Sequence, residues 1–114
     1  MSAVFLEPTK TDLTTTLQDL TTPTPTGKVR TFNVRYANVG ADAAYGDLVL
    51  TDGTVIITRA KNYPVPYQKA GSAPDMEEGI VVPAGWKLQG KASAGLVVQA
   101  SISNGIEADT TDFA

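Results

Sequence analysis

The segment Lys28–Asn38 most constrains the fold, because its apolar and polar residues alternate over a full strand length. Phe32, Val34 and Tyr36 lie two residues apart, so they share one face of an extended chain, and polar residues take the other face. A period of two residues is typical of a strand that buries one face. No segment shows a convincing helical apolar stripe longer than two turns, so the pattern favours strands throughout.

A second constraint is the pair Asp52-Gly53, which separates the apolar runs Asp47–Thr51 and Thr54–Arg59. An Asp-Gly pair between two such runs is the strongest short-range signal for a β-hairpin, because a type I′ turn needs positive φ at both central residues. We therefore predict a hairpin with a type I′ turn at this pair.

Further short β-rich runs follow, punctuated by Gly, Pro and Asn. The predicted strands are Gly79–Pro83, Trp86–Ala92 and Leu96–Ser103. Pro64 and Pro66 donate no ladder hydrogen bonds, so the segment 62–67 is predicted to be an edge segment or an extended loop. Residues 68–78 are predicted to form a surface loop, and Asn104-Gly105 a tight turn. With fifteen Thr and seven Pro, about six strands between residues 28 and 103 predict an all-β fold, a small β-sandwich or jelly roll.

Residues 1–27 differ from the rest, since they are Thr-rich and end in alternating Thr and Pro, which favours extended chain. One interpretation is a flexible leader with one added strand over Asp12–Leu20. The other is an extended N-terminal arm that lies across a neighbouring subunit, with Leu13, Leu17 and Leu20 as its partner contacts. On the second interpretation, a protein without residues 1–27 is expected to fold but not to bind its particle.

The charges divide the chain further. The net charge is −3, and Glu107, Asp109 and Asp112 supply all of it, because residues 1–106 carry nine acids and nine bases. The predicted domains are therefore the arm 1–27, a β-sandwich 28–107 and an acidic tail 108–114. A neutral body with an acidic tail has no field that would attract nucleic acid or an anionic membrane, so neither is a predicted partner.

The sequence offers little for catalysis. It contains no Cys and no His, which excludes disulfide frameworks, thiol nucleophiles and His-based triads. Glu77 and Glu78 are better explained as the edge of a solvated loop than as an acid–base pair. The Asp residues show no EF-hand spacing, so we predict no metal site, no cofactor and no enzymatic activity.

Aromatic residues mark a second candidate surface. Tyr63 and Tyr67 flank the two prolines, and with Val65 they are predicted to form a partner contact in this loop. The alternative is that both rings hold the Pro-rich loop on the sandwich edge. A third interpretation joins Tyr63, Tyr67 and Trp86 into a platform for sugar stacking.

The segment 79–107 resembles the C-terminal half of many small virion proteins of tailed phages. In those proteins an apolar strand leads into a Pro-Ala-Gly turn (residues 83–85 here), a strand ending near Lys-Ala-Ser-Ala (91–94), and a Val-rich strand closing with Gly-x-Glu (105–107). The stretch from Lys28 to Gly40 looks like the matching first strand. The resemblance implies a β-sandwich component of the particle and brings no catalytic residues with it.

The resemblance and the arm together predict a non-enzymatic, homo-oligomeric capsid decoration (cement) subunit, with a trimer favoured. Its expected partners are the major capsid protein or other virion proteins, and its expected location is the virion, on the capsid surface rather than the tail. A neck, tail or fibre-attachment component is the second hypothesis, and a carbohydrate-binding module is the third.

Overall fold

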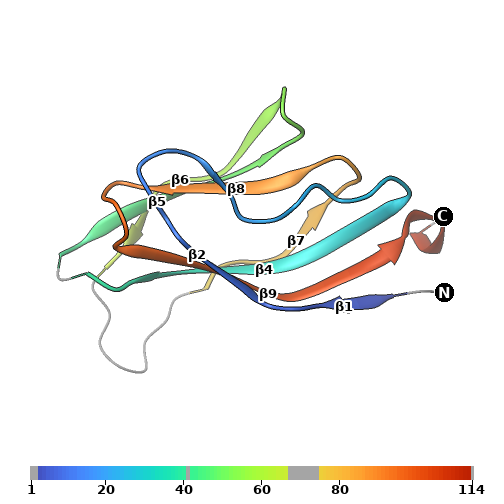
Figure 1. The fold of residues 1–114 in the computed structure, drawn as a ribbon, viewed down its shortest axis with the longest axis horizontal. Helices are drawn as coiled ribbons and strands as arrows, with labels where there is room; N and C mark the ends of the chain where they lie inside the picture. The colour runs from blue at the N-terminus through green and yellow to red at the C-terminus, as the bar shows by residue number, and fades with distance from the viewer. Residues whose placement is uncertain (1–2, 41, 67–74, 114) are drawn as a thin grey trace.

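The computed structural model describes residues 3–40, 42–66 and 75–113, and folds them into two antiparallel sheets packed face to face (Figure 1). The larger sheet contains β1 (Val4–Leu6), β2 (Thr9–Asp12), β4 (Lys28–Asn38), β7 (Asp75–Val82) and β9 (Val98–Asp109). The smaller sheet contains β3 (Gln18–Asp19), β5 (Ala44–Thr51), β6 (Ile56–Val65) and β8 (Lys87–Ala92). The predicted all-β sandwich is confirmed, and its six predicted strands correspond to β4–β9.

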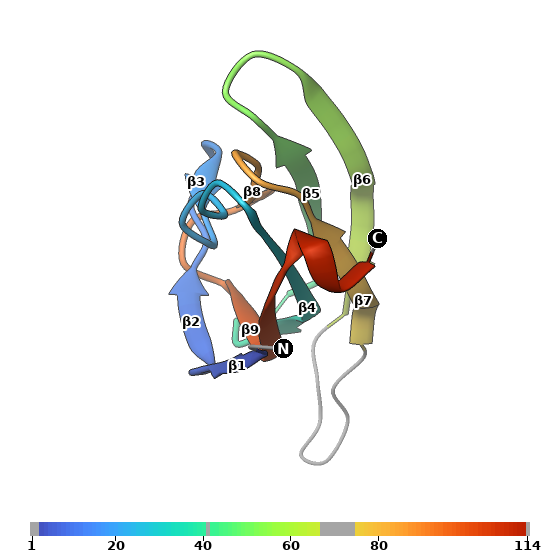
Figure 2. The same cartoon turned by 90° about the vertical axis from the view of Figure 1, so that its right-hand side faces the viewer.

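The strand order explains which parts of the sandwich are open. The larger sheet runs β1-β9-β4-β7, with β2 also paired to β9, and the smaller sheet runs β3-β8-β5-β6. One side of the sandwich is therefore bordered by β1, β2 and β3, and the other by β6 and β7 (Figure 2). A 3-10 turn, η1 (Thr110–Phe113), follows β9. No helix in the described part of the chain is long and apolar enough to cross a membrane.

The core lies where the alternation of β4 predicts it. Phe32, Val34 and Tyr36 are 5%, 1% and 0% exposed. They meet the inner residues of β8, whose burial alternates in the same way. The period of two therefore locates the core face of both strands.

Tyr36 is the largest fully buried side chain, and two glycines make room for it. A Cβ atom at Gly46 or Gly90 would lie 2.6 or 2.3 Å from atoms of Tyr36, closer than real side chains approach. The hydroxyl donates a hydrogen bond to the Asp47 carbonyl oxygen at 2.8 Å. Burial of the phenol raises the pKa of Tyr36 above its usual value, and the nearby Asp47 charge adds to the effect.

The predicted hairpin is confirmed as β5–β6, but the predicted type I′ turn is wrong. Gly53 has a φ of 98°, whereas Asp52 lacks the positive φ that a type I′ turn requires. The strands pair at Thr51 and Ile56, so the loop holds four residues. The Asp52 carboxylate accepts hydrogen bonds from the backbone N–H groups of residues 54 and 55 at 2.9 and 2.7 Å. An Asx-type loop has replaced the two-residue turn.

The predicted turn at Asn104-Gly105 is also wrong, because β9 continues through it to Asp109. The pairing with β4 shifts there by one residue, and Asn104 has a φ of 51°. This is a β-bulge, in which an extra residue is accommodated inside a strand. A Cβ atom at Gly105 would lie 3.0–3.1 Å from Leu6 and the Phe32 ring, so the glycine permits close packing.

The N-terminal segment is not a separate arm in the structure. β1 and β2 pair with β9, β3 pairs with β8, and Thr24 forms a bridge to Ala84. The predicted boundary at residue 27 is thus corrected, since residues 3–27 complete both sheets on one side of the sandwich. The predicted acidic tail 108–114 is corrected as well, because Asp109 belongs to β9 and pairs with Lys28 of β4.

The Pro-containing segment is an edge strand, as predicted. Pro64 lies in β6, which pairs on one side with β5 and has no partner strand on the other among the described residues. The predicted surface loop 68–78 lies partly outside the described residues, and its last part is the beginning of β7.

Candidate functional site

The predicted arm contacts are mostly part of the core. Leu13 and Leu20 are 0% and 5% exposed and belong to the core cluster. Their backbone N–H groups donate to Val98 and Leu88 carbonyl oxygens at 2.9 and 2.8 Å. The prediction that these two leucines bind a neighbour is therefore corrected, because their side chains are used inside the protomer. Leu17 alone of the three is exposed, at 39%.

The predicted loop contact divides in a similar way. Val65 is fully buried, which corrects its assignment to a contact surface, and Tyr63 is partly buried against the core. Tyr67 lies outside the described residues. Tyr63 pairs with Gly46 at one end of β5, while Trp86 precedes Lys87, which pairs with Thr51 at the other end. Tyr63 and Trp86 therefore lie at opposite ends of β5 and do not share one platform.

The exposed apolar surface lies elsewhere, and its first part is a row across the outer face of the larger sheet. Phe5 pairs with Ile106, Ile106 pairs with Thr31, and Thr31 pairs with Val81. Phe5, Ile106 and Val81 are 84%, 36% and 54% exposed. Directly opposed residues on adjacent strands lie side by side on one face. We call this row, Phe5, Ile106, Thr31 and Val81, the outer-face row.

The second part is the hairpin tip, defined as residues 54–57. Val55, Ile56 and Ile57 are 50%, 57% and 44% exposed, although consecutive residues of a strand point to opposite faces. The hairpin therefore exposes both of its faces, and Figure 1 shows it projecting beyond the two sheets.

The third part is a hollow of about 430 Å³, the side groove, between the β1–β2 bend and the segment that follows β3. Leu6, Leu20, Phe32 and Ile102 contribute apolar side chains to it. All of its other lining residues except the proline are polar; they are Glu7, Thr9, Asp19, Thr21, Thr22 and Pro23. The side groove was not predicted, although two prolines at 23 and 25 indicate that the chain cannot continue β3 along this edge.

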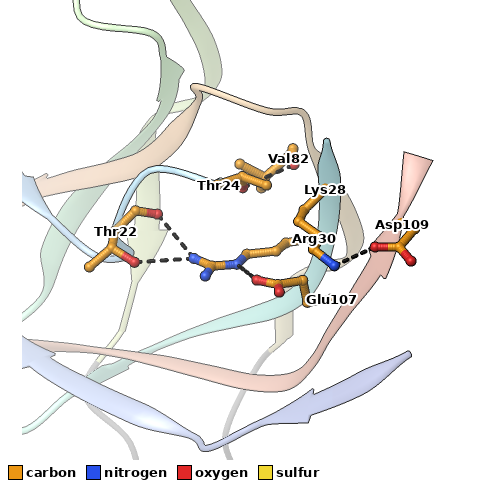
Figure 3. Close-up of polar contacts among 7 residues, drawn as sticks. All are labelled: Thr22, Thr24, Lys28, Arg30, Val82, Glu107 and Asp109. Carbon is orange, nitrogen blue, oxygen red and sulfur yellow. Dashed lines mark hydrogen bonds and ion pairs between the residues drawn. The ribbon is translucent and has the colours of Figure 1, made fainter. Parts of the chain in front are cut away.

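A polar network fixes one wall of the side groove (Figure 3). The Arg30 Nε donates to Glu107 at 2.7 Å, and its Nη1 donates to the Thr22 hydroxyl at 3.1 Å. The Arg30 and Glu107 side chains are only 14% and 17% exposed. Lys28 pairs with Asp109 beside them, and the Thr24 hydroxyl donates to the Val82 carbonyl oxygen at 3.2 Å. The segment 22–24 is thus held directly to β4 and β7, and through Arg30 to β9.

Each side of the sandwich has an ion pair near its border, and the hairpin loop has a carboxylate held by the backbone. Asp19 pairs with Lys87 at 2.9 Å, and hydrogen bonds from Gln89 and Lys87 lower the pKa of the Asp19 carboxyl. On the other side Arg59 pairs with Glu77, and the hydrogen bond to Glu77 raises the pKa of the Arg59 guanidinium. Backbone hydrogen bonds lower the pKa of Asp52 in the hairpin loop. In the part of the chain that the structure describes, no three acidic, His or Cys residues are grouped to hold a metal ion.

Comparisons with known proteins add one likeness. No family model and no curated protein matches the chain. Among solved structures, the chain is similar to the crystal structure of a pentameric capsid protein isolated from metagenomic phage sequences. The two are 20% identical with a TM-score of 0.44, and the match covers 90% of this chain and 61% of that chain. The present chain therefore spans less than two thirds of that protein's length.

Proposed function

We propose that the chain is a structural, non-enzymatic protein of a phage virion. The resemblance of residues 28–40 and 79–107 to small virion proteins supports this proposal, and the structure places both segments in the sandwich, as β4 and as β7–β9. More finely, we propose a capsid decoration (cement) subunit that forms homo-oligomers and binds the major capsid protein.

The exposed apolar surface is the observation that carries the proposal. Eleven large apolar residues of the described chain are more than about a third exposed, and several are contiguous. Single exposed apolar residues are ordinary, but contiguous patches mark interaction surfaces. The outer-face row crosses four strands, as suits docking on a broad lattice.

The proposed role of the outer-face row can be tested on particles that lack this protein. Purified protein is mixed with such particles, and bound protein is measured by sedimentation and gel densitometry. Phe5→Ser is expected to reduce occupancy at least tenfold, and Leu96→Ser, which changes another exposed apolar residue outside the outer-face row, to leave it unchanged. Full occupancy by the Phe5 variant would contradict the assignment of this face.

The second hypothesis, a neck, tail or fibre-attachment component, differs in copy number. A decoration subunit is present in proportion to the major capsid protein, whereas a neck or tail ring is present in one small multiple. Densitometry of native particles against the major capsid protein separates the two. The carbohydrate-binding hypothesis loses support because Tyr63 and Trp86 do not share a platform, and a glycan panel read by Trp86 fluorescence tests it.

A further inference from the structure

The hairpin tip is an exposed apolar projection whose loop is closed by its own hydrogen bonds. All residues from Asp52 to Arg59 are exposed, and three consecutive β-branched apolar residues lie in the middle of this stretch. Thr51 and Asp52 hold the loop closed through hydrogen bonds to residues 53–55, so the tip has a defined shape before it meets any partner. A preorganised apolar projection loses little conformational entropy when it docks.

The side groove complements the hairpin tip, because it is a hollow with apolar side chains on its floor. Its four apolar side chains come from β1, β4, β9 and the residue after β3, so its floor belongs to the rigid core. Its wall is held by the Arg30 network, and its volume of about 430 Å³ is within the range of sites that enclose apolar groups.

The charges around the two features are also complementary. The described lining of the side groove includes Glu7 and Asp19 and no base. The strand that leaves the hairpin tip, β6, includes Arg59 and Lys61 and no acid. Asp19 and Arg59 already have partners, Lys87 and Glu77, so the exposed pair available for attraction is Glu7 with Lys61.

We propose that the hairpin tip of one copy inserts into the side groove of the next copy, with Val55, Ile56 and Ile57 against its apolar floor. This inference rests on the proposed function, whose homo-oligomer it explains. The hairpin tip between β5 and β6 lies apart from β1–β3, which border the side groove (Figures 1 and 2). The contact is therefore heterologous and builds a ring or an open chain rather than a two-fold dimer.

A complementation experiment tests this arrangement with the full chain. Ile56→Asp with Ile57→Asp removes the hairpin tip's apolar surface, and Thr9→Trp fills the side groove from an exposed lining position. Light scattering after size exclusion is expected to give a multiple of 12.0 kDa for the unmodified chain and a monomer for each variant. Val81→Asp is the matched control, since it changes an exposed apolar residue of the outer-face row, and it is expected to keep the oligomer.

Mixing the two variants gives the sharpest result. Each retains one half of the contact, so the mixture is expected to form a heterodimer of one copy of each and nothing larger. A monomeric unmodified chain at every soluble concentration, an oligomer that survives both variants, or a mixture that stays monomeric would each overturn the inference. Circular dichroism checks the fold, and Ile57→Asp alone replaces the double variant if that variant is unfolded. The particle-binding assay reads the proposed function separately, so either can fail alone.

Discussion

The N-terminal side of the sandwich and the hairpin tip both contain large apolar residues, but the structure uses two leucines of the first and two isoleucines of the second in opposite ways. Leu13 and Leu20 are buried, whereas Ile56 and Ile57 are 57% and 44% exposed. The N-terminal segment consists of strands of two to four residues, yet every strand pairs with a longer one. The hairpin has long strands, but its tip extends beyond the opposing sheet. Position over the core, rather than strand length, decides which apolar residues stabilise the fold.

The largest effect is expected from deletion of residues 1–27. The deletion removes β1–β3 and two buried leucines, each worth about 2–5 kcal/mol, against a total stability of about 5–15 kcal/mol. The truncated protein is therefore expected to be unfolded, which reverses the expectation from sequence. Circular dichroism and urea titration measure this. A truncated chain with a cooperative transition near that of the full chain would show that the segment is dispensable.

A matched pair of substitutions compares the two regions directly. Leu13→Ala is expected to lower the free energy of unfolding by about 2–5 kcal/mol, because it leaves a cavity in the core. Ile56→Ala is expected to change it by no more than about 0.5 kcal/mol in the monomeric Thr9→Trp background, because no neighbouring copy covers the hairpin tip there and the side chain is largely in water. Urea denaturation of both variants in that background checks the difference. Equal losses would mean that Ile56 packs within its own protomer.

The strands from β4 onward could be predicted because their signals are local. Alternation in Lys28–Asn38 located the core face, Asp52-Gly53 located the hairpin, and Pro64 located an edge. The turn type and the bulge at Asn104 depend on the opposing strand. Asn-Gly favours positive φ equally in a turn and in a bulge, and only the pairing with β4 decides between them.

The candidate surfaces could be predicted less well. Leu13, Leu17 and Leu20 have the i, i+4, i+7 spacing of a helix face, but no helix forms here, because the chain crosses from one sheet to the other between β2 and β3. Where each leucine lies along this crossing decides its burial, so Leu13 and Leu20 are buried and Leu17 is exposed. The side groove combines residues from the β1–β2 bend, the segment after β3, β4 and β9, so no local pattern marks it. The three apolar residues of the hairpin tip were visible, but their exposure depends on the length of the opposing sheet.

The ion pairs of Arg30 and Arg59 allow the same two regions to be compared through smaller changes in the free energy of unfolding. Arg30→Met is expected to cost about 1–2 kcal/mol, between exposed pairs and fully buried ones, because Glu107 stays mostly buried without a partner. Arg59→Met is expected to cost no more than about 1 kcal/mol, because its pair with Glu77 is more exposed. Thermal melts of both variants measure the difference. A smaller loss for Arg30 than for Arg59 would show that the wall of the side groove does not depend on this network.

The smallest effects are expected from two carboxyls, Asp19 on the N-terminal side and Asp52 in the hairpin loop. Both have a lowered pKa, so each stabilises the fold above its unfolded pKa of about 3.9, and this contribution is lost as the pH falls through the folded value. The causes differ, because Asp19 is held first by Gln89 and then by Lys87, whereas Asp52 is held by backbone N–H groups. NMR titration is expected to show that Lys87→Met or added salt moves the Asp19 pKa back toward its usual value and leaves Asp52 unchanged. If salt moved both pKa values equally, a distant charge rather than the backbone N–H groups of the loop would hold the Asp52 carboxylate. The hydrogen bonds of Asp52 would then no longer support a fixed shape for the hairpin tip.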